Sequence, residues 1–307
     1  MKMVWDAFIA IYLFLAGLGA GAFVLGALTN WAKKPAPAMK KIAFIVGPVA
    51  VAVGTLVLVV DAHAGFNNPM RFFLLISNLG SVMSWGVIIL SVFLVVSIID
   101  LIVLLVKKST PKALDIVGAV MAVCVAAYTG VLLGDAGVAF PLWNMAILPV
   151  LFVVSAASTG FAIVMLVTHL AKPEETEALP FMGKVGLALP VLELALVIVL
   201  LAVTATADGS AAAAASASVA NLISGPYAVA FWLGFIAIGL VLPFCLEMVR
   251  HRKGVGADPA TSEGLPSDRP SGASDMTLAL AGECAVLVGG FMLRYLVIMA
   301  AVAVALV

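Results

Sequence analysis

The sequence predicts an all-α integral membrane protein, with eight transmembrane helices packed as helical bundles and both termini on the extracytoplasmic side. Composition is the first observation: 64% of the residues are hydrophobic and 10% are charged. A soluble domain has about 45–50% apolar and about 25% charged residues. The second observation is the length of the apolar runs, because a helix needs about 20 apolar residues to cross the hydrocarbon core. A transmembrane barrel would instead show strands of about ten residues with alternating polarity.

Short polar stretches divide the chain into eight apolar segments. We expect helices at residues 7–30, 42–60, 74–106, 113–134, 142–170, 185–207, 223–249 and 277–306. The one long polar stretch, about 250–276, is rich in Gly, Pro and Ser, which predicts a flexible cytoplasmic loop rather than another domain. We therefore expect a single polytopic membrane domain over residues 1–307.

Two of these segments have features of their own. The first exceeds the 7–15-residue core of a signal peptide and carries Gly17, Gly19 and Gly21 at helix-packing spacing, so we interpret it as a retained helix. The third apolar run, 72–106, is too long for one crossing. We expect its start to lie along the outer interface and its helix to begin at Gly80 or Ser81.

The distribution of Lys and Arg predicts the orientation. Thirteen of these residues lie in the first, third, fifth and seventh loops. The opposite side has only Lys2 and Arg71, and Arg294 lies within a helix. Cytoplasmic loops carry the excess of positive charge in membrane proteins. We therefore place the odd-numbered loops in the cytoplasm and both termini outside.

Several kinds of site have little support. Cys124, Cys245 and Cys284 lie singly in apolar runs, so we expect small buried hydrophobes rather than an iron–sulfur cluster or a structural zinc site. A membrane b-type haem needs axial ligands that face each other, whereas the three histidines lie near span ends on different sides. We expect no haem and no metal in this protein. The basic loops are short and cytoplasmic, and they give no support for nucleic-acid binding.

Ionisable groups inside a membrane are costly, so each one is a candidate site. The polar candidates on the outer side are Asp61, His63, Asn67, Arg71, Tyr128, Asp135 and Arg294. Tyr128 and Asp135 are seven residues apart and share one helix face. Arg294 needs a carboxylate or a bound oxygen, which Asp61 or Asp135 could supply. Alternatively, these residues end helices in water around one structural ion pair.

The inner side holds a second set of ionisable residues. Those near predicted helix ends, which we expect to reach water, are Asp100, Asp115, Glu247, His169 and His251. Glu193 and Glu283 lie deeper, roughly 9–12 Å past the inner helix starts. Two interpretations of these glutamates stay open: each is protonated and inert, or they form part of a proton path.

Four stretches occur in order in the first five segments: YLFLAGLGAGAF at 12–23, NPMRF with SWG at 68–72 and 84–86, AYTGVLL at 127–133, and PLWN at 141–144. Together they resemble the NrfD/PsrC family, of the polysulfide reductase type. Members of this family are the quinone-interacting membrane subunits of respiratory molybdoenzyme and multihaem-cytochrome complexes. The expected span count, outward termini and lack of haem ligands agree with it.

The resemblance implies a haem-less subunit that binds menaquinone or ubiquinone near the outer face. It would exchange electrons with an extracytoplasmic, ferredoxin-like iron–sulfur subunit, and through it with a molybdopterin or multihaem cytochrome subunit. Such a protein is the membrane anchor and quinone-reactive part of an oxidoreductase complex and is not catalytic alone. It would reside, surrounded by lipid, in the cytoplasmic membrane of a bacterium or archaeon.

The resemblance also implies roles for residues. Tyr128 matches a position implicated in holding a quinone carbonyl, while Asp61 and Arg71 match the acidic and arginine positions after the second helix. Asp61 and His63 would exchange protons with the outer water.

One position departs from the family pattern. An asparagine can occur early in the first helix, where this sequence has Ile9, so Tyr12 or His63 would supply that hydrogen bond. Asn67, Asp135 and Arg294 complete the predicted quinone site.

Two other interpretations compete with a quinone-binding subunit. A secondary transporter would hold a small substrate at mid-membrane between interrupted helices, which Pro149, Pro190 and Pro243 could mark, although no repeat is evident. A purely structural anchor would explain the helices but would leave Arg294 and the deep glutamates without a purpose.

The charge asymmetry predicts the sidedness of two loops. In a background without the native cysteines, Asn67→Cys should react with a membrane-impermeant thiol reagent added outside intact cells, and Ser109→Cys should react only after the membrane is opened. Labelling of the two variants is compared by mass shift. Equal labelling of Ser109→Cys from outside would contradict the orientation.

Overall fold

A computed structural model describes residues 7–32, 34–61, 78–179, 181–255 and 271–304, and all regular structure in these ranges is helical. The long helices are α1 (Ala7–Leu28), α2 (Pro37–Asp61), α5 (Val82–Lys107), α6 (Lys112–Gly134), α7 (Leu148–Ala171), α8 (Met182–Ala205), α10 (Leu242–Val255) and α11 (Ser271–Met299). The shorter ones are η1 (Thr29–Trp31), η2 (Pro173–Ala178), η3 (Gly209–Ala211), α9 (Ala212–Ile223) and the π-helix η4 (Ala230–Val241), which runs into α10. Eight of the described helical segments are long and apolar enough to cross a membrane, which confirms the predicted fold class.

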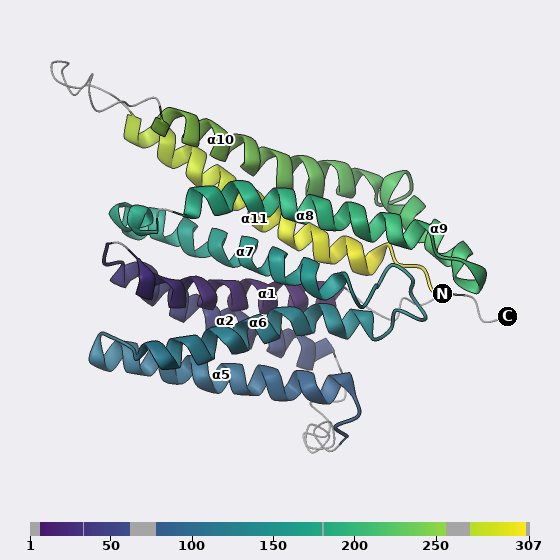
Figure 1. The fold of residues 1–307 in the computed structure, drawn as a ribbon, viewed down its shortest axis with the longest axis horizontal. Coiled ribbons are helices and arrows are strands. Elements are labelled where there is room, and N and C mark those ends of the chain that lie inside the picture. The colour runs from purple at the N-terminus through teal and green to yellow at the C-terminus, as the bar shows by residue number, and fades with distance from the viewer. Residues whose placement is uncertain (1–6, 33, 62–77, 180, 256–270, 305–307) are drawn as a thin grey trace.

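The start of α1 and the end of α11 lie at the same end of the molecule (Figure 1). We call this the outer end, because the charge distribution predicts that it is extracytoplasmic, and we call the opposite end the inner end. The connections α1–α2, α5–α6 and α7–α8 lie at the inner end, where the lysine-rich sequences were expected.

The crossings form two bundles of four. Helices α1, α2, α5 and α6 pack together, and α7, α8, η4–α10 and α11 form the second set, which lies above the first in Figure 1. Helix α1 has a central position, because it contacts α7 and α11 of the second bundle as well as α2 and α6 of its own. The α1–α7 pair makes the largest single contact between the bundles, and α6 also packs against α7.

Glycines allow α1 and α7 to approach each other closely. A Cβ atom on Gly21 would overlap the carbonyl oxygen of Ala156, and one on Gly160 would overlap the backbone of Gly21 and Ala22. Small residues are the usual means by which membrane helices bring their backbones together, since lipid provides little hydrophobic drive for association. The prediction that the glycines of the first helix serve packing is therefore confirmed.

Helix boundaries mostly follow the apolar runs. Helix α5 begins directly after Ser81, whose hydroxyl accepts a hydrogen bond from Met83 N at 3.3 Å, as predicted; residues 72–77 lie outside the described ranges. Helix α7 begins at Leu148 rather than at 142, because the preceding residues form turns. Trp143 in these turns donates from Nε1 to Val297 O at 2.8 Å and thereby ties them to α11.

The Ala/Ser-rich stretch at 208–218, which we expected to be a loop, contains most of the short helix α9 at the outer end. Helix α11 stops at Met299, not at 306, and the segment that follows pairs with its neighbours: Val302 N donates to Ser218 Oγ at 2.9 Å, and Val304 N donates to Ala139 O at 2.8 Å. The expected long loop at 250–276 is shortened, because α10 extends to Val255 and α11 starts at Ser271.

The contact between the bundles generates a stability prediction. Gly21→Ala adds one methyl group where the backbone of Ala156 already lies, so the free energy of unfolding should fall by about 1–3 kcal/mol. Gly282→Ala in α11 is the matched control, since its nearest neighbour would lie 3.8 Å away and alanine favours a helix. Unfolding by heat or by a denaturing detergent measures both. Equal stability of the two variants would contradict the packing argument.

Candidate functional site

Two buried tyrosines lie on neighbouring helices in the outer half of the first bundle. Tyr12 of α1 is fully buried, and its hydroxyl has no hydrogen-bond partner among the described residues. Tyr128 of α6 is 7% exposed and packs against Gly86 of α5, where a Cβ atom would overlap the phenol hydroxyl. The two phenols are close enough to interact electrostatically. The SWG and AYTG stretches therefore meet at one place.

This arrangement leaves hydrogen-bonding capacity unused. The buried Tyr12 hydroxyl has no partner among the described residues, and no described residue forms a hydrogen bond with the hydroxyl of Tyr128, which is 7% exposed. A buried hydroxyl without a partner is unfavourable in an apolar setting. A ligand with carbonyl oxygens would satisfy both phenols, whose apolar surroundings also suit a ring.

The structure shows only part of the predicted outer cluster. Asp135 follows the end of α6, is exposed and lies near enough to Tyr128 to act on it electrostatically. Asp61 ends α2, but its side chain is not described. His63, Asn67 and Arg71 lie outside the described ranges.

Arg294 is completely buried where α11 meets α1 and α7. Its Nε donates to Leu13 O at 3.1 Å, and its Nη1 donates to Ser155 Oγ and to Gly290 O, each at 2.9 Å. The Nη2 atom has no partner among the described residues. It points toward Gly17, where a Cβ atom would lie 2.5 Å from it.

The described contacts do not pair Arg294 with Asp135, and the side chain of Asp61, the other expected partner, lies outside the described residues. The carboxyl group that acts on Arg294 is Glu193 of α8. Asp135 is exposed at the end of α6, whereas Arg294 lies in the interior on the side of the second bundle, which is the reason for the difference. Glu193 was a candidate from its depth, but pattern alone did not connect it to Arg294.

Serine side chains link the two buried charges. Glu193 is 3% exposed, and the side chains of Ser155 and Ser158 of α7 lie near its carboxyl group. Ser155 therefore contacts both Arg294 and Glu193. Glu193 Oε1 still has no partner among the described residues.

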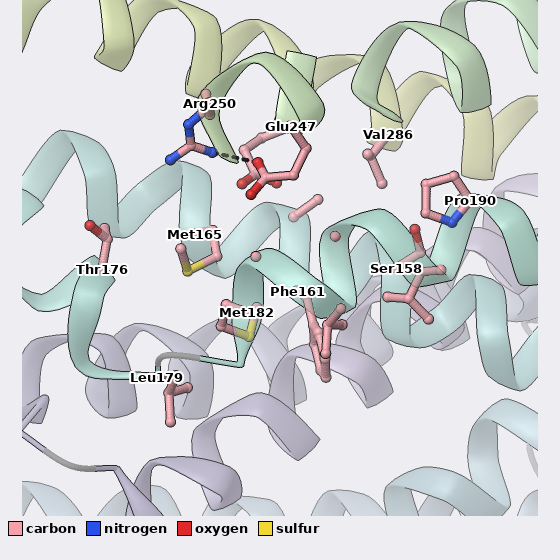
Figure 2. A pocket seen from close by; sticks show the side chains of 16 residues that line it. Ser158, Phe161, Met165, Thr176, Leu179, Met182, Pro190, Glu247, Arg250 and Val286 are labelled. Carbon is pink, nitrogen blue, oxygen red and sulfur yellow. Dashed lines mark hydrogen bonds and ion pairs between the residues drawn. The ribbon is translucent and has the colours of Figure 1, made fainter. Parts of the chain in front are cut away.

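A pocket of about 420 Å³ opens in the inner half of the second bundle, between α7, η2, α8, α10 and α11. Figure 2 shows Glu247 and Arg250 joined by a hydrogen bond on one side of it and Ser158 on the other. The Glu247–Arg250 distance is 2.8 Å, and Glu283 also lines the pocket. Because Ser158 is a neighbour of Glu193, polar groups continue from the pocket to the buried arginine.

Several inner residues are buried, contrary to the expectation that they reach water. Asp100 and Asp115 have no exposure, and His169 is 6% exposed with Nδ1 2.9 Å from Met165 O. The sequence reasoning did not pair Asp115 with Lys40, and the structure shows a 2.6 Å ion pair between them. The expectation that Cys245 and Cys284 are buried is also wrong, because both side chains are exposed on the helix surface. No described group of three His, Cys, Asp or Glu residues could hold a metal.

The family described as "Polysulphide reductase, NrfD" matches residues 1–257. The protein belongs to this family. The comparison confirms the resemblance carried by the four short stretches, all of which lie within the matched region.

Three related proteins extend the comparison. The C subunit of polysulfide reductase from Wolinella succinogenes is 31% identical over 82% of this sequence and 87% of the relative. Protein NrfD of Escherichia coli K12 is 32% identical over 97% and 95%. An NrfD homolog of Haemophilus influenzae is 27% identical over 80% and 84%. The similarity thus covers nearly the whole membrane domain.

Proposed function

We propose that this member of the NrfD family is the haem-less quinone- or quinol-binding membrane subunit of a respiratory oxidoreductase complex. The observation that carries the proposal is the pair of neighbouring phenols: the Tyr12 hydroxyl is buried without a partner among the described residues, and no described residue forms a hydrogen bond with the Tyr128 hydroxyl. They lie in the outer half of the first bundle, whose helices are long and apolar enough to cross a membrane, and a membrane-soluble ligand with two carbonyl oxygens would supply an acceptor for each phenol.

The residues present fit a quinone ring. Tyr128 would donate to one carbonyl, and Gly86 opposite it is the position where a larger side chain would interfere with that phenol. Tyr12 is the second donor. When bound, a quinone accepts two electrons and two protons. Asp135, exposed near Tyr128, would exchange protons with outer water, as would Asp61 at the end of α2 and His63, which follows it in the sequence.

The electron partner is proposed to be an extracytoplasmic, ferredoxin-like iron–sulfur subunit. One relative is named as the C subunit of polysulfide reductase, and such a name indicates an assembly of several subunits. Because the candidate site lies near the outer end, that subunit would dock there, around the α6–α7 connection.

The transporter interpretation has less support. Of its three candidate interruptions, Pro149 lies in the first turn of α7, where proline is readily tolerated, and Pro190 lies inside a continuous α8. Only Pro243 directly follows irregular helix, the π-helical turns of η4. The family match favours an oxidoreductase subunit over a solute transporter.

A proton route through the second bundle is a further part of the proposal. Glu283 would take up protons from the inner pocket and Glu193 would receive them next, with Ser158 between the pocket and Glu193. Arg294 and Ser155 continue the polar groups toward α1, where Arg294 contacts Leu13 O next to Tyr12. This favours the second of the two interpretations of the deep glutamates.

Tyr128→Phe tests the quinone site, because it removes only the hydroxyl. Losing one hydrogen bond should weaken quinone binding by about 1–2 kcal/mol, which is roughly five- to thirty-fold. The measurement is quinone-dependent turnover of the intact complex across quinone concentrations. Tyr227→Phe is the matched control, because it removes a tyrosine hydroxyl on the side of the second bundle. It should leave turnover and apparent quinone affinity unchanged.

Electron transfer from the iron–sulfur partner to an artificial acceptor that bypasses this subunit should not change in Tyr128→Phe. Unaltered turnover and apparent quinone affinity in both Tyr128→Phe and Tyr12→Phe would mean that the site lies elsewhere.

Glu193→Gln and Glu283→Gln test the proton route. Each variant keeps the side-chain shape but cannot exchange a proton, so proton uptake from the inner side should slow on the order of 10²-fold. Proteoliposomes with a trapped pH dye report protons taken up per electron. Glu174→Gln, on exposed η2, is the control. An unchanged ratio in both deep variants would refute the route while leaving the quinone site intact.

A further inference from the structure

A second cluster of buried charges lies at the inner end of the first bundle. Asp115 of α6 accepts three hydrogen bonds at Oδ2: from Lys40 Nζ and Asn30 Nδ2, each at 2.6 Å, and from Thr110 Oγ1 at 2.8 Å. Lys40 also donates to Asn30 Oδ1 at 2.8 Å. One oxygen of this carboxylate is therefore saturated by donors from three parts of the sequence.

The other oxygens in the cluster are not saturated. Asp100 of α5 has no exposure, and neither of its carboxyl oxygens has a partner that would donate to it among the described residues. Asp115 Oδ1 is also buried and without a donor. The two carboxyl groups are within interaction range of each other, and Asp100 Oδ2 lies 3.1 Å from the position a Cβ atom would take on Gly118, one turn along α6 from Asp115.

The balance of charge in the cluster explains why these oxygen atoms lack donors. The charged groups that act on Asp100 from the helices packed against it are Asp115 of α6 and Lys40 of α2. One ammonium group faces two carboxyl groups. If both were ionised, an uncompensated negative charge would be buried, which is strongly unfavourable. A single proton on Asp100 removes that charge and supplies the donor that Asp115 Oδ1 lacks.

Aromatic rings close the cluster on its membrane side. Phe23 and Phe44 stack with centroids 4.5 Å apart, and Phe93 meets Phe23 edge to face at 5.5 Å. All three rings lie farther from the inner end along their helices than the cluster does. Toward the inner end, Lys40 is 11% exposed. Exchange with water is therefore directed to the inner side.

We infer that Asp100 and Asp115 form a carboxyl–carboxylate pair that binds one exchangeable proton from the inner side of the membrane. The proton sits on Asp100 and is donated to Asp115 Oδ1, while Lys40 neutralises the charge of Asp115. The site lies in the same bundle as Tyr12 and Tyr128 but at its opposite end, and it does not depend on the quinone proposal.

Infrared spectroscopy of the purified protein in lipid tests the site. A protonated carboxylic acid has a C=O stretching band apart from those of carboxylates and amides, and this band shifts in D₂O when the proton exchanges. The wild-type protein should show such a band. Asp100→Asn, which keeps the shape and one N–H donor toward Asp115, should lose one carboxylic-acid equivalent.

Variants of the two residues that act on Asp100 should change the intensity of this band in opposite directions. In Asp115→Asn, Asp100 becomes the counter-ion of Lys40 and ionises, so the band should again decrease by one equivalent. In Lys40→Met, Asp115 loses its counter-charge and takes up a proton, so the band should increase by one equivalent. Chromatography in detergent shows which variants remain folded.

Two further variants serve as controls. Asp135→Asn, at the outer end, and Tyr128→Phe should leave the band unchanged, which separates this site from the quinone proposal. Absence of any exchangeable acid band in the wild-type protein overturns the inference without any variant. An Asp100→Asn spectrum equal to that of the wild type does the same and would assign the cluster to ion pairing only.

Discussion

The close approach of α1 to α7 is the constraint on which the rest of the structure depends. Lipid competes equally well for apolar side chains, so two helical bundles stay together through backbone contact and internal polar bonds. Gly21 and Gly160 allow the contact, since any side chain at either position would overlap the opposite backbone. The same helix face carries Gly17, one turn toward the outer end, and the space beside it accommodates the guanidinium of Arg294. Packing and burial of charge are thus consequences of one row of small residues.

A buried charge in a membrane protein needs internal partners, and this protein supplies them differently in its two bundles. Arg294 is held by backbone carbonyls, a serine hydroxyl and the rings of Phe14 and Phe152, with Glu193 as its carboxyl partner. Lys40 instead forms a direct 2.6 Å ion pair with Asp115. The first arrangement spreads a positive charge over many weak partners and leaves a polar path to the inner pocket. The second is compact and closed by aromatic rings.

The sequence predicted those features that depend on local composition. Runs of about twenty apolar residues located the eight crossings, and the polar break before Val82 located the start of α5. It did not predict α9, because an Ala/Ser-rich stretch is as typical of a loop as of a short helix. Its contacts with α8 and η4 and its hydrogen bonds with Ala300 and Val302 required the structure. Nor did it pair Arg294 with Glu193 or bury Asp100, because distance from a helix end says nothing about which neighbour lies opposite. Tyr128 was found through a motif, yet the role of Gly86 beside it required the structure.

The positions of the titratable groups suggest different roles for the two bundles, with the phenols in the first and a polar route to the inner pocket in the second. In the first bundle the phenols lie in the outer half and Asp100 at the inner end, and the rings of Phe23, Phe44 and Phe93 pack on the membrane side of Asp100. A proton held by Asp100 therefore faces an apolar layer in the direction of Tyr128. In the second bundle, a pocket opens near the inner end. Polar side chains lead from it into the interior of the protein: Ser158, then Glu193, then Ser155. They end at Arg294, which contacts the backbone of α1 beside Tyr12. A proton that joins the inner side to the phenols would thus travel through the second bundle and enter the first across the α1–α7 contact. The glycines that join the bundles then also determine how near the two polar regions come to each other.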